Sequence, residues 1–372
     1  MKLTIERAAL LKTLSHVQSV VERRNTIPIL SNVLLEAKDG RLAMTATDMD
    51  VAINEAVEAD IATDGQTTAA AQTFYDIVRK LPDGAQVEIA LDGEAGQLTV
   101  RAGRARFTLS TLPPEDFPAM NSGELSHNLS LAASELRGLI DRTRFAISTE
   151  ETRYYLNGIY LHADENEGVQ VLRAVAADGP RLARVEMPLP EGAGGMPGVI
   201  VPRKTVTELR KLIDEVGDAI EVGLSETRIK FAFDNAVMVS KLIDGTFPDY
   251  TRVIPDGNDK IMEVDRQAFT EAVDRVSTIS TEKSRAVKLT LNPGNLVLSA
   301  SSSESGSATE EIEVSYDDTP IEVGFNSRYL LDITQQIEGD GAQFVMADAS
   351  SPTVVRDVAD ASALYVVMPM RV

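Results

Sequence analysis

The stretch LTIERAALLKTL, from Leu3 to Leu14, decides the fold, because the chain repeats its pattern twice more. A short strand pattern runs into an amphipathic helix pattern, and the same succession returns in LSLAASELRGLI from Leu129 and in MEVDRQAFTEAV from Met262. The offsets are roughly 130 residues, too long for a solenoid repeat and long enough for a domain with its own core. The 372 residues are therefore predicted to form three related domains.

Three further kinds of segment follow in the same order in each repeat: a turn with a strand, a strand with a helix, and a closing strand. They span residues 40–50, 67–81 and 107–118, then 168–179, 198–212 and 237–248, then 294–305, 320–333 and 364–372. Each repeat thus reads as two helices and about eight strands, with helices on one face of antiparallel sheets, an α+β arrangement. Turn formers place the domain limits at 1–124, 125–257 and 258–372.

The composition, 43% hydrophobic and 25% charged, is typical of a soluble globular protein. No run approaches the ~18 apolar residues of a membrane span, and the N-terminus has no signal-peptide pattern, so we expect a cytoplasmic protein without a membrane partner. The absence of cysteine agrees with a reducing compartment. The three histidines lack the spacing of a metal site, and neither metal nor cofactor is expected.

No motif of an enzyme is present. The chain contains no GxSxG, no phosphate loop, no HExxH and no EF-hand pattern. The glycines from Gly192 to Gly195 lack the strand-then-helix context of a dinucleotide site and are interpreted as a loop. The main alternative is a hydrolase with two carboxylates about 5 to 9 Å apart in a deep pocket. Acidic pairs such as Glu150-Glu151 are expected to be solvated surface instead, which favours a non-catalytic protein.

The net charge of −21 argues against nucleic acid as a partner, but its distribution argues the other way. Six predicted helical windows hold 16 basic and 13 acidic residues, whereas the rest of the chain holds 20 basic and 44 acidic residues. The windows are 6–24, 72–81, 134–147, 203–215, 265–276 and 326–338. Helices that carry solvated charges of both signs would explain the same contrast.

The chain ends in YVVMPMRV, from Tyr365 to Val372. Tyr365 to Val367 are predicted to form a buried strand. Met368 to Val372 cannot all belong to a core, because they include Pro369, Arg371 and the terminal carboxylate. Adaptable, methionine-rich surface suits the binding of several partners, so a docking role stands beside burial as an interpretation.

Over its whole length the chain resembles the bacterial DNA polymerase III beta subunit, the sliding clamp. Six motifs carry the likeness: TIPILSNVLLEA (26–37), STLPPEDFP (110–118), RYYLNGIYL (153–161), VPRK (201–204), KLIDGTFPDYTRVIP (241–255) and the terminal YVVMPMRV. The resemblance implies three clamp domains with inner helices backed by sheets, joined head to tail as a ring-shaped homodimer. It implies no catalysis. Such a ring encircles double-stranded DNA and tethers the polymerase III alpha subunit.

Helix packing supports two chains per ring. Helices spaced at ~9 Å with side chains reaching ~5 Å inward leave a hole of roughly 7 Å for six helices and roughly 25 Å for twelve. Eighteen would leave roughly 40 Å, so only twelve suit a duplex about 20 Å across. A trimeric clamp, or a scaffold that never meets DNA, is the rival prediction. Solution mass, with retention on nicked circular against linear DNA, separates these.

The resemblance also implies residue roles. Positions where family members touch DNA, without reading its sequence, are Arg24, Thr73, Tyr154, Tyr155, Arg203 and Lys204. Thr73 stands where relatives carry a basic residue, and Glu150 replaces an uncharged one. The two tyrosines could equally be packed at a domain junction.

A groove between the second and third domains is implied to accept a short peptide from the polymerase alpha subunit, the clamp loader or repair proteins. Its walls are Leu156, Ala177, Gly179, Pro180, Arg181, Leu182, Pro248, Arg252, Val253, Asn326, Tyr329, Val366, Val367, Met368, Pro369, Met370, Arg371 and Val372. Pro180 stands where relatives often carry histidine. The dimer contact is implied to join the strand edge with Phe107 and Leu109 to the third domain's first helix, near Phe269 and Ile279.

Overall fold

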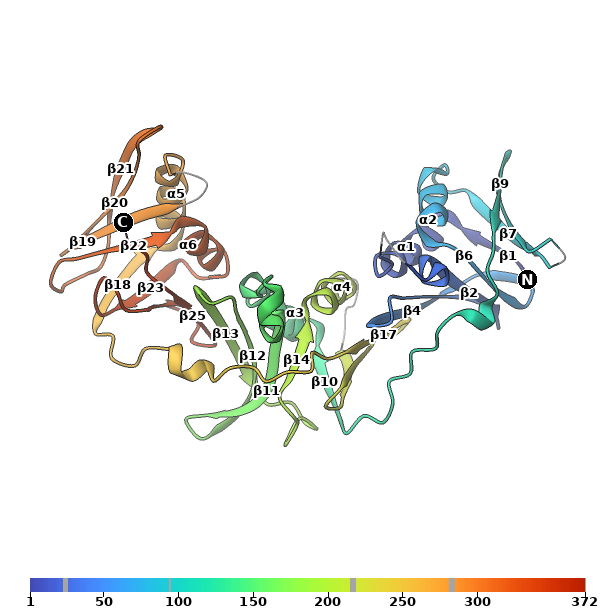
Figure 1. Ribbon diagram of the computed structural model, residues 1–372, viewed down its shortest axis with the longest axis horizontal. Helices are drawn as coiled ribbons and strands as arrows, with labels where there is room; N and C mark the ends of the chain where they lie inside the picture. The colour runs from blue at the N-terminus through green and yellow to red at the C-terminus, as the bar shows by residue number, and fades with distance from the viewer. Residues whose placement is uncertain (23–25, 94, 215–218, 281–284, 372) are drawn as a thin grey trace. The chain divides into compact units, whose positions relative to one another are not determined.

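The computed structural model describes residues 1–22, 26–93, 95–214, 219–280 and 285–371, which form the predicted α+β fold (Figure 1). The chain groups into two compact units. The first comprises residues 1–136, 190–197 and 204–242, and the second comprises residues 137–189, 198–203 and 243–372. The division crosses the second predicted domain, and the limits 1–124, 125–257 and 258–372 stay a prediction.

Two helices fall within each repeat, as the sequence predicts. They are α1 (Arg7–Gln18), α2 (Ala71–Lys80), α3 (Ala133–Asp141), α4 (Arg203–Ile213), α5 (Arg266–Ser277) and α6 (Ser327–Thr334). Glu6 and Asp265 cap α1 and α5, where their carboxylates accept hydrogen bonds from backbone N–H groups of the first turn. Except for α5, the helices end earlier than the predicted windows; the segment after α3, for example, continues as a 3-10 turn at Arg144–Ala146.

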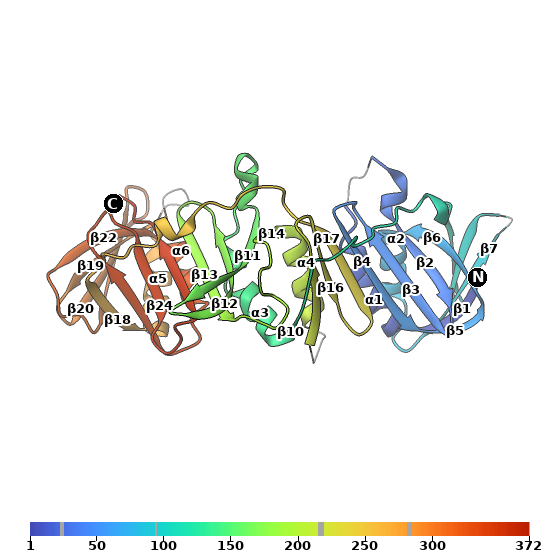
Figure 2. The ribbon, with the colours of Figure 1, turned by 90° about the horizontal axis from the view of Figure 1, so that it is seen from below.

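The first unit contains two antiparallel sheets. Five strands lie in the order β5 (Asp60–Thr63), β1 (Lys2–Glu6), β7 (Gln86–Asp92), β8 (Gln97–Ala102), β9 (Ala105–Ser110). Eight strands lie in the order β10 (His127–Ala132), β15 (Ala219–Leu224), β16 (Arg228–Ala232), β17 (Ala236–Lys241), β4 (Val51–Glu58), β3 (Arg41–Thr47), β2 (Asn32–Lys38), β6 (Gly65–Ala70). The pairing of β17 with β4 joins the second repeat to the first, so one sheet serves both (Figure 2).

The second unit follows the same plan. Eight strands lie in the order β14 (Val199–Pro202), β11 (Gly158–Asn166), β12 (Val169–Ala177), β13 (Arg181–Pro188), β25 (Ala363–Val367), β24 (Thr353–Asp357), β23 (Gly341–Met346), β18 (Lys260–Asp265). Four lie in the order β21 (Gly306–Glu313), β20 (Asn295–Ser302), β19 (Ala286–Asn292), β22 (Ile321–Asn326). Here β13 of the second repeat pairs with β25 of the third, so the two repeats share one sheet.

Each unit buries the apolar faces of its helices against its sheets. In the first repeat Leu10, Leu14 and Val17 of α1 are fully buried, and in the third Phe269, Ala272 and Val273 of α5 are fully buried. The ring of Phe269 packs 4.9 Å from that of Phe344. The expectation that Phe269 contributes to a contact with another chain is therefore wrong, because this side chain has no exposed surface.

Two strands, β9 and β21, end their sheets without a second neighbour. Burial alternates along β9: Phe107 and Leu109 are half-buried, whereas Thr108 and Ser110 are exposed. Ile279, just after α5, is also half-buried. An unpaired strand edge offers backbone N–H and C=O groups to another strand, so β9 and β21 are two of the sheet ends at which a sheet could continue into another chain.

Candidate functional site

The groove predicted from the sequence has an apolar floor in the second unit. Leu156, Leu182 and Val366 belong to one buried cluster with Phe247 and Tyr250, and Ala177 packs against it. The pairing of β13 with β25 sets Leu182 directly opposite Val366. Leu156 closes a 3-10 segment (Glu151–Leu156) whose backbone is held by a hydrogen bond from Ser148 N–H to Leu156 O. Residues from four parts of the sequence thus meet in one place.

Exposed residues, here called the rim, lie next to members of this cluster along the chain. Val253 keeps 48% of its surface exposed and Met368 keeps 39%, and both side chains are large and apolar. Pro248, Gly179 and Pro180 are exposed as well. Val253 ends the 3-10 segment Tyr250–Val253, whose Tyr250 is anchored in the cluster, and Arg252 in the same segment is exposed. The arrangement therefore presents apolar surface beside a rigid base.

One predicted wall residue is wrong. Val367 has no exposed surface and pairs with both Arg181 and Thr353 in the sheet, so it cannot touch a bound molecule directly. Leu156, Leu182 and Val366 are at most 6% exposed, so they form a buried base and offer little surface to a bound molecule. The supporting roles of Phe247 and Tyr250 were not predicted, although both lie inside the motif KLIDGTFPDYTRVIP.

The chain terminus is fastened beside the rim by backbone hydrogen bonds. Met368 N–H donates to Pro180 O at 2.8 Å, and Met370 N–H donates to Gly324 O at 2.8 Å. Pro369 and Met370 are half-buried and Arg371 is exposed, while Val372 lies outside the described residues. The prediction that the terminal residues do not all enter the core is confirmed.

Arg181 connects the groove to a polar cavity of about 520 Å³. Its guanidinium pairs with Asp178 and Asp332, donates to Phe145 O, and stacks over the ring of Tyr329 at 4.5 Å. Asn326 also lines this cavity, and its side-chain oxygen caps α6 by accepting from Arg328 N–H at 3.0 Å. Arg181, Asn326 and Tyr329 thus lie together, as predicted, but Arg181 is buried and held by its partners.

The predicted DNA-contacting residues fall into different environments. Thr73 on α2 and Arg203 at the start of α4 are exposed, and Tyr154 keeps 52% of its surface exposed. Tyr155 is half-buried and packs against the apolar cluster. This agrees with the alternative in which the tyrosine is packed within the protein and does not contact DNA. Arg24 lies outside the described residues.

Lys204 is engaged in an ion-pair cluster within the first unit. Its ammonium donates to Val20 O at 2.8 Å and pairs with Asp48 at 2.6 Å and with Glu22. Burial raises the pKa of Asp48, but hydrogen bonds from Lys204 and from the backbone N–H groups of Val51 and Asp50 outweigh it, so the net pKa is lowered. Lys204 thus fastens the start of α4 to the segment after α1, and carboxylates compensate its charge.

The variant Lys204→Met is expected to lower the melting temperature by several degrees at pH 7, because it leaves the mostly buried Asp48 carboxylate without its cation. A lowered pKa means that the ionised pair stabilises the fold above the ordinary pKa of aspartate and loses this effect as the pH falls through the lowered value. Thermal melting followed at pH 7 and pH 3.5 should show the deficit shrinking at the lower pH. A deficit of equal size at both values would contradict the ion-pair account.

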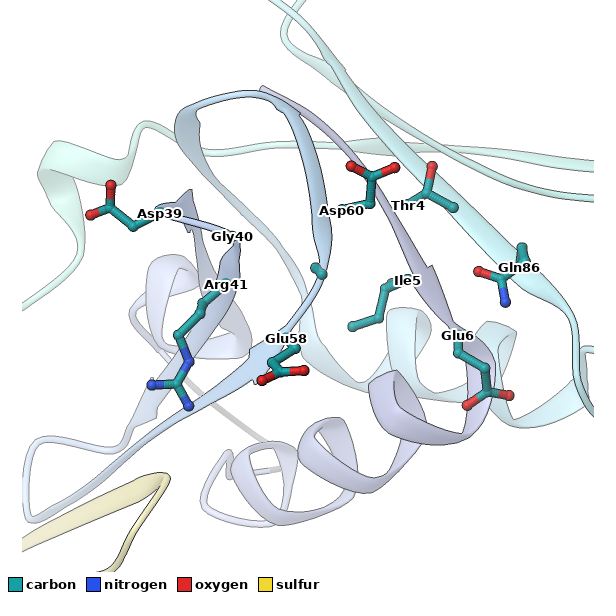
Figure 3. Close-up of a pocket in the computed structure, with 10 residues that line it drawn as sticks. Thr4, Ile5, Glu6, Asp39, Gly40, Arg41, Glu58, Asp60 and Gln86 are labelled. Carbon is teal, nitrogen blue, oxygen red and sulfur yellow. The ribbon is translucent and has the colours of Figure 1, made fainter.

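A second cavity, of about 730 Å³, lies in the first unit between β1, the turn that joins β2 to β3, and the segment where β4 ends and β5 begins (Figure 3). Its charged lining is Glu6, Asp39, Arg41, Glu58 and Asp60. The carboxylates are spread around the opening and do not converge on one point. Across the residues that the structure describes, no group of three or more His, Cys, Asp or Glu side chains is placed to hold a metal ion.

Comparison with known proteins identifies the class. Family models for the N-terminal, central and C-terminal domains of the DNA polymerase III beta subunit match residues 1–121, 130–249 and 251–371. The beta sliding clamp of Caulobacter vibrioides is 56% identical over 372 residues, covering all of both chains, and that of Escherichia coli is 38% identical over 372 residues with the same coverage.

Solved structures agree. A crystal structure of the C. crescentus beta sliding clamp superposes with a TM-score of 0.98 at 56% identity, covering all of this chain and 99% of that one. A Bartonella birtlesii sliding clamp bound to griselimycin superposes with a TM-score of 0.96 at 49% identity, covering both chains fully. The chain belongs to the family of bacterial DNA polymerase III beta subunits.

Its three repeats are accordingly clamp domains, and it is a DNA sliding clamp, a processivity factor without catalytic activity that encircles duplex DNA as a ring-shaped dimer. None of the helices in the described part of the chain is long and apolar enough to cross a membrane.

Proposed function

We propose that this clamp holds the polymerase alpha subunit, the clamp loader and other replication and repair proteins through the groove described above, and that it does so in the cytoplasm. The single observation that carries the proposal is the exposed apolar rim of Val253 and Met368 beside the buried cluster of Leu156, Leu182 and Val366. Partners that share one rim must compete for it, and adaptable methionine side chains suit peptides of different sequence.

The DNA contact is proposed to be weak and independent of the DNA sequence. A clamp that slides needs attraction to phosphates without base contacts, since retention comes from the closed ring. Arg203 and Tyr154 are exposed and are proposed as the main contacts of the described set. Thr73 contributes no charge, and the ion pairs of Lys204 reduce its attraction for phosphate. The acidity of the rest of the chain discourages DNA from binding elsewhere.

The dimer contact is proposed to be head to tail, between the β9 edge of one chain and the third domain of its partner. Phe107 and Leu109 would meet Ile279 of the partner subunit, beside the open β21 edge. A heterologous contact of this kind makes a closed ring when the rotation fits, which agrees with the ring of the family.

Replacing Val253 by aspartate tests the groove. The change puts a charge where apolar peptide surface would be buried, so binding of a labelled alpha-subunit peptide is expected to weaken by about 10- to 100-fold in a fluorescence polarisation titration. Val169→Asp is the matched control, since Val169 on β12 is 58% exposed and is not part of the groove. Equal weakening by both variants would refute the proposed location.

A further inference from the structure

The polar cavity beside the groove is lined by more arginines than carboxylates. Three arginines, Arg181, Arg285 and Arg328, line it together with two carboxylates, Glu150 and Asp178. The surplus is a local feature that the proposed function does not yet use.

Both lining carboxylates are already bound by guanidinium groups. Glu150 accepts two hydrogen bonds from Arg153, from Nε at 2.8 Å and from Nη2 at 2.6 Å. Asp178 accepts from Arg181 Nε at 3.0 Å and from the Arg181 backbone N–H at 3.2 Å. Each carboxylate thus already accepts two hydrogen bonds from one arginine, so neither is available to a further cation.

Arg328 is the most exposed of the three lining arginines, since Arg181 is buried and Arg285 is half-buried. Its side chain is 63% exposed, and its Nε lies 3.8 Å from the Asp332 carboxylate, a long contact. The same oxygen of Asp332 accepts from Arg181 Nη1 at 2.5 Å, so Asp332 is shared between two cations. Asp332 therefore compensates only part of the charge on Arg328.

The position of the cavity indicates what could enter it. Pro180, Arg181, Asn326 and Tyr329 line the cavity and are also among the residues predicted to form the groove, and Leu182, next to Arg181, belongs to the buried cluster. The cavity also holds the start of α6, where the dipole of the helix favours an anion. A chain docked on the apolar rim would bring its flanking residues to this opening.

We propose that the cavity binds an acidic side chain, aspartate or glutamate, of the peptide that docks in the groove, with Arg328 as the principal cation. This inference rests on the proposed groove. It makes the clamp selective for partners with a carboxylate flanking their apolar anchors. Continuity with the groove favours this occupant over a phosphate of nucleic acid, which would compete as a separate class of ligand.

The test uses the full-length clamp and a labelled alpha-subunit peptide made as two series, with a single Glu or a single Gln at each position that flanks the apolar anchors. In polarisation titrations at low salt, one Glu peptide is expected to bind about 3- to 10-fold more tightly than its Gln counterpart. Arg328→Gln should remove this preference without changing the affinity of the Gln peptide. Arg356→Gln, which removes an exposed arginine on β24, should keep the preference.

Other outcomes are decisive too. Equal binding of every Glu and Gln pair by the unmodified clamp would overturn this inference and leave the groove standing, whereas no binding of any peptide would overturn the groove itself. Equal weakening of both peptides by Arg328→Gln would show a general effect on docking and refute the carboxylate site. If the variant instead loses binding of a single-stranded oligonucleotide and keeps the peptide preference, the cavity serves nucleic acid and the inference fails.

Discussion

A clamp with both Phe107 and Leu109 replaced by aspartate is expected to be a single chain in solution and to lose its hold on circular DNA. The two side chains lie on one face of β9, at the open end of its sheet, and are half-buried within the isolated chain. Four added charges per dimer at two equivalent contacts would have to be desolvated when the ring closes, which apolar contact areas do not tolerate.

Light scattering measures the first effect. The mass should fall from about twice the chain mass of 40.2 kDa to that mass itself. Thr108→Asp together with Ser110→Asp is the matched control, because these residues alternate with the others and point to the exposed face of the same strand. The control should stay dimeric. A dimeric Phe107, Leu109 variant would place the contact elsewhere on the chain.

Retention on DNA measures the second effect. Loaded clamps should stay on nicked circular DNA and leave it once it is cut to a linear form, because a closed ring is held by topology and not by strong contacts. The monomeric variant should be retained on neither form. Equal retention of the unmodified clamp on circular and linear DNA would contradict the topological mechanism.

Local sequence signals were enough to predict the elements, because they act over a few residues. The Asp265 cap, the apolar face of α5 and the hairpin turn at Gly103 with its positive φ all follow from local patterns. The same periodicity shows that Phe269 belongs to the buried face of its helix. Its assignment to a contact between chains followed from the resemblance and not from this pattern, and in the structure the side chain has no exposed surface.

Long-range features could not be predicted in the same way. The ion pairs of Lys204 join residues 156 and 182 positions apart, and nothing local distinguishes a paired lysine from a solvated one. The groove floor depends on the pairing of β13 with β25, which brings Leu182 opposite Val366 across most of the third repeat. Only the resemblance to a family predicted that these two residues lie close together, since strand pairing between such distant parts of the sequence leaves no periodic signal.

Deleting Met368 to Val372 is expected to abolish binding of the alpha-subunit peptide while leaving the dimer intact. The deletion removes Met368, the exposed apolar side chain at the rim, together with the half-buried Pro369 and Met370. Residues central to a small interface often carry most of its binding energy, so a loss of more than about 100-fold in affinity is expected.

The fold should survive this deletion because the segment lies outside β25. It removes the backbone hydrogen bonds to Pro180 O and Gly324 O, each about 1 kcal/mol, and leaves the buried pairing of Val366 and Val367 in place. A clamp shortened only by Arg371 and Val372 is the control, since it keeps both bonds and both methionines, and it should retain most of the affinity. Unchanged mass by light scattering, with peptide binding lost, separates docking from assembly. Loss of the dimer would show that the terminus supports the ring and would count against its place in the groove.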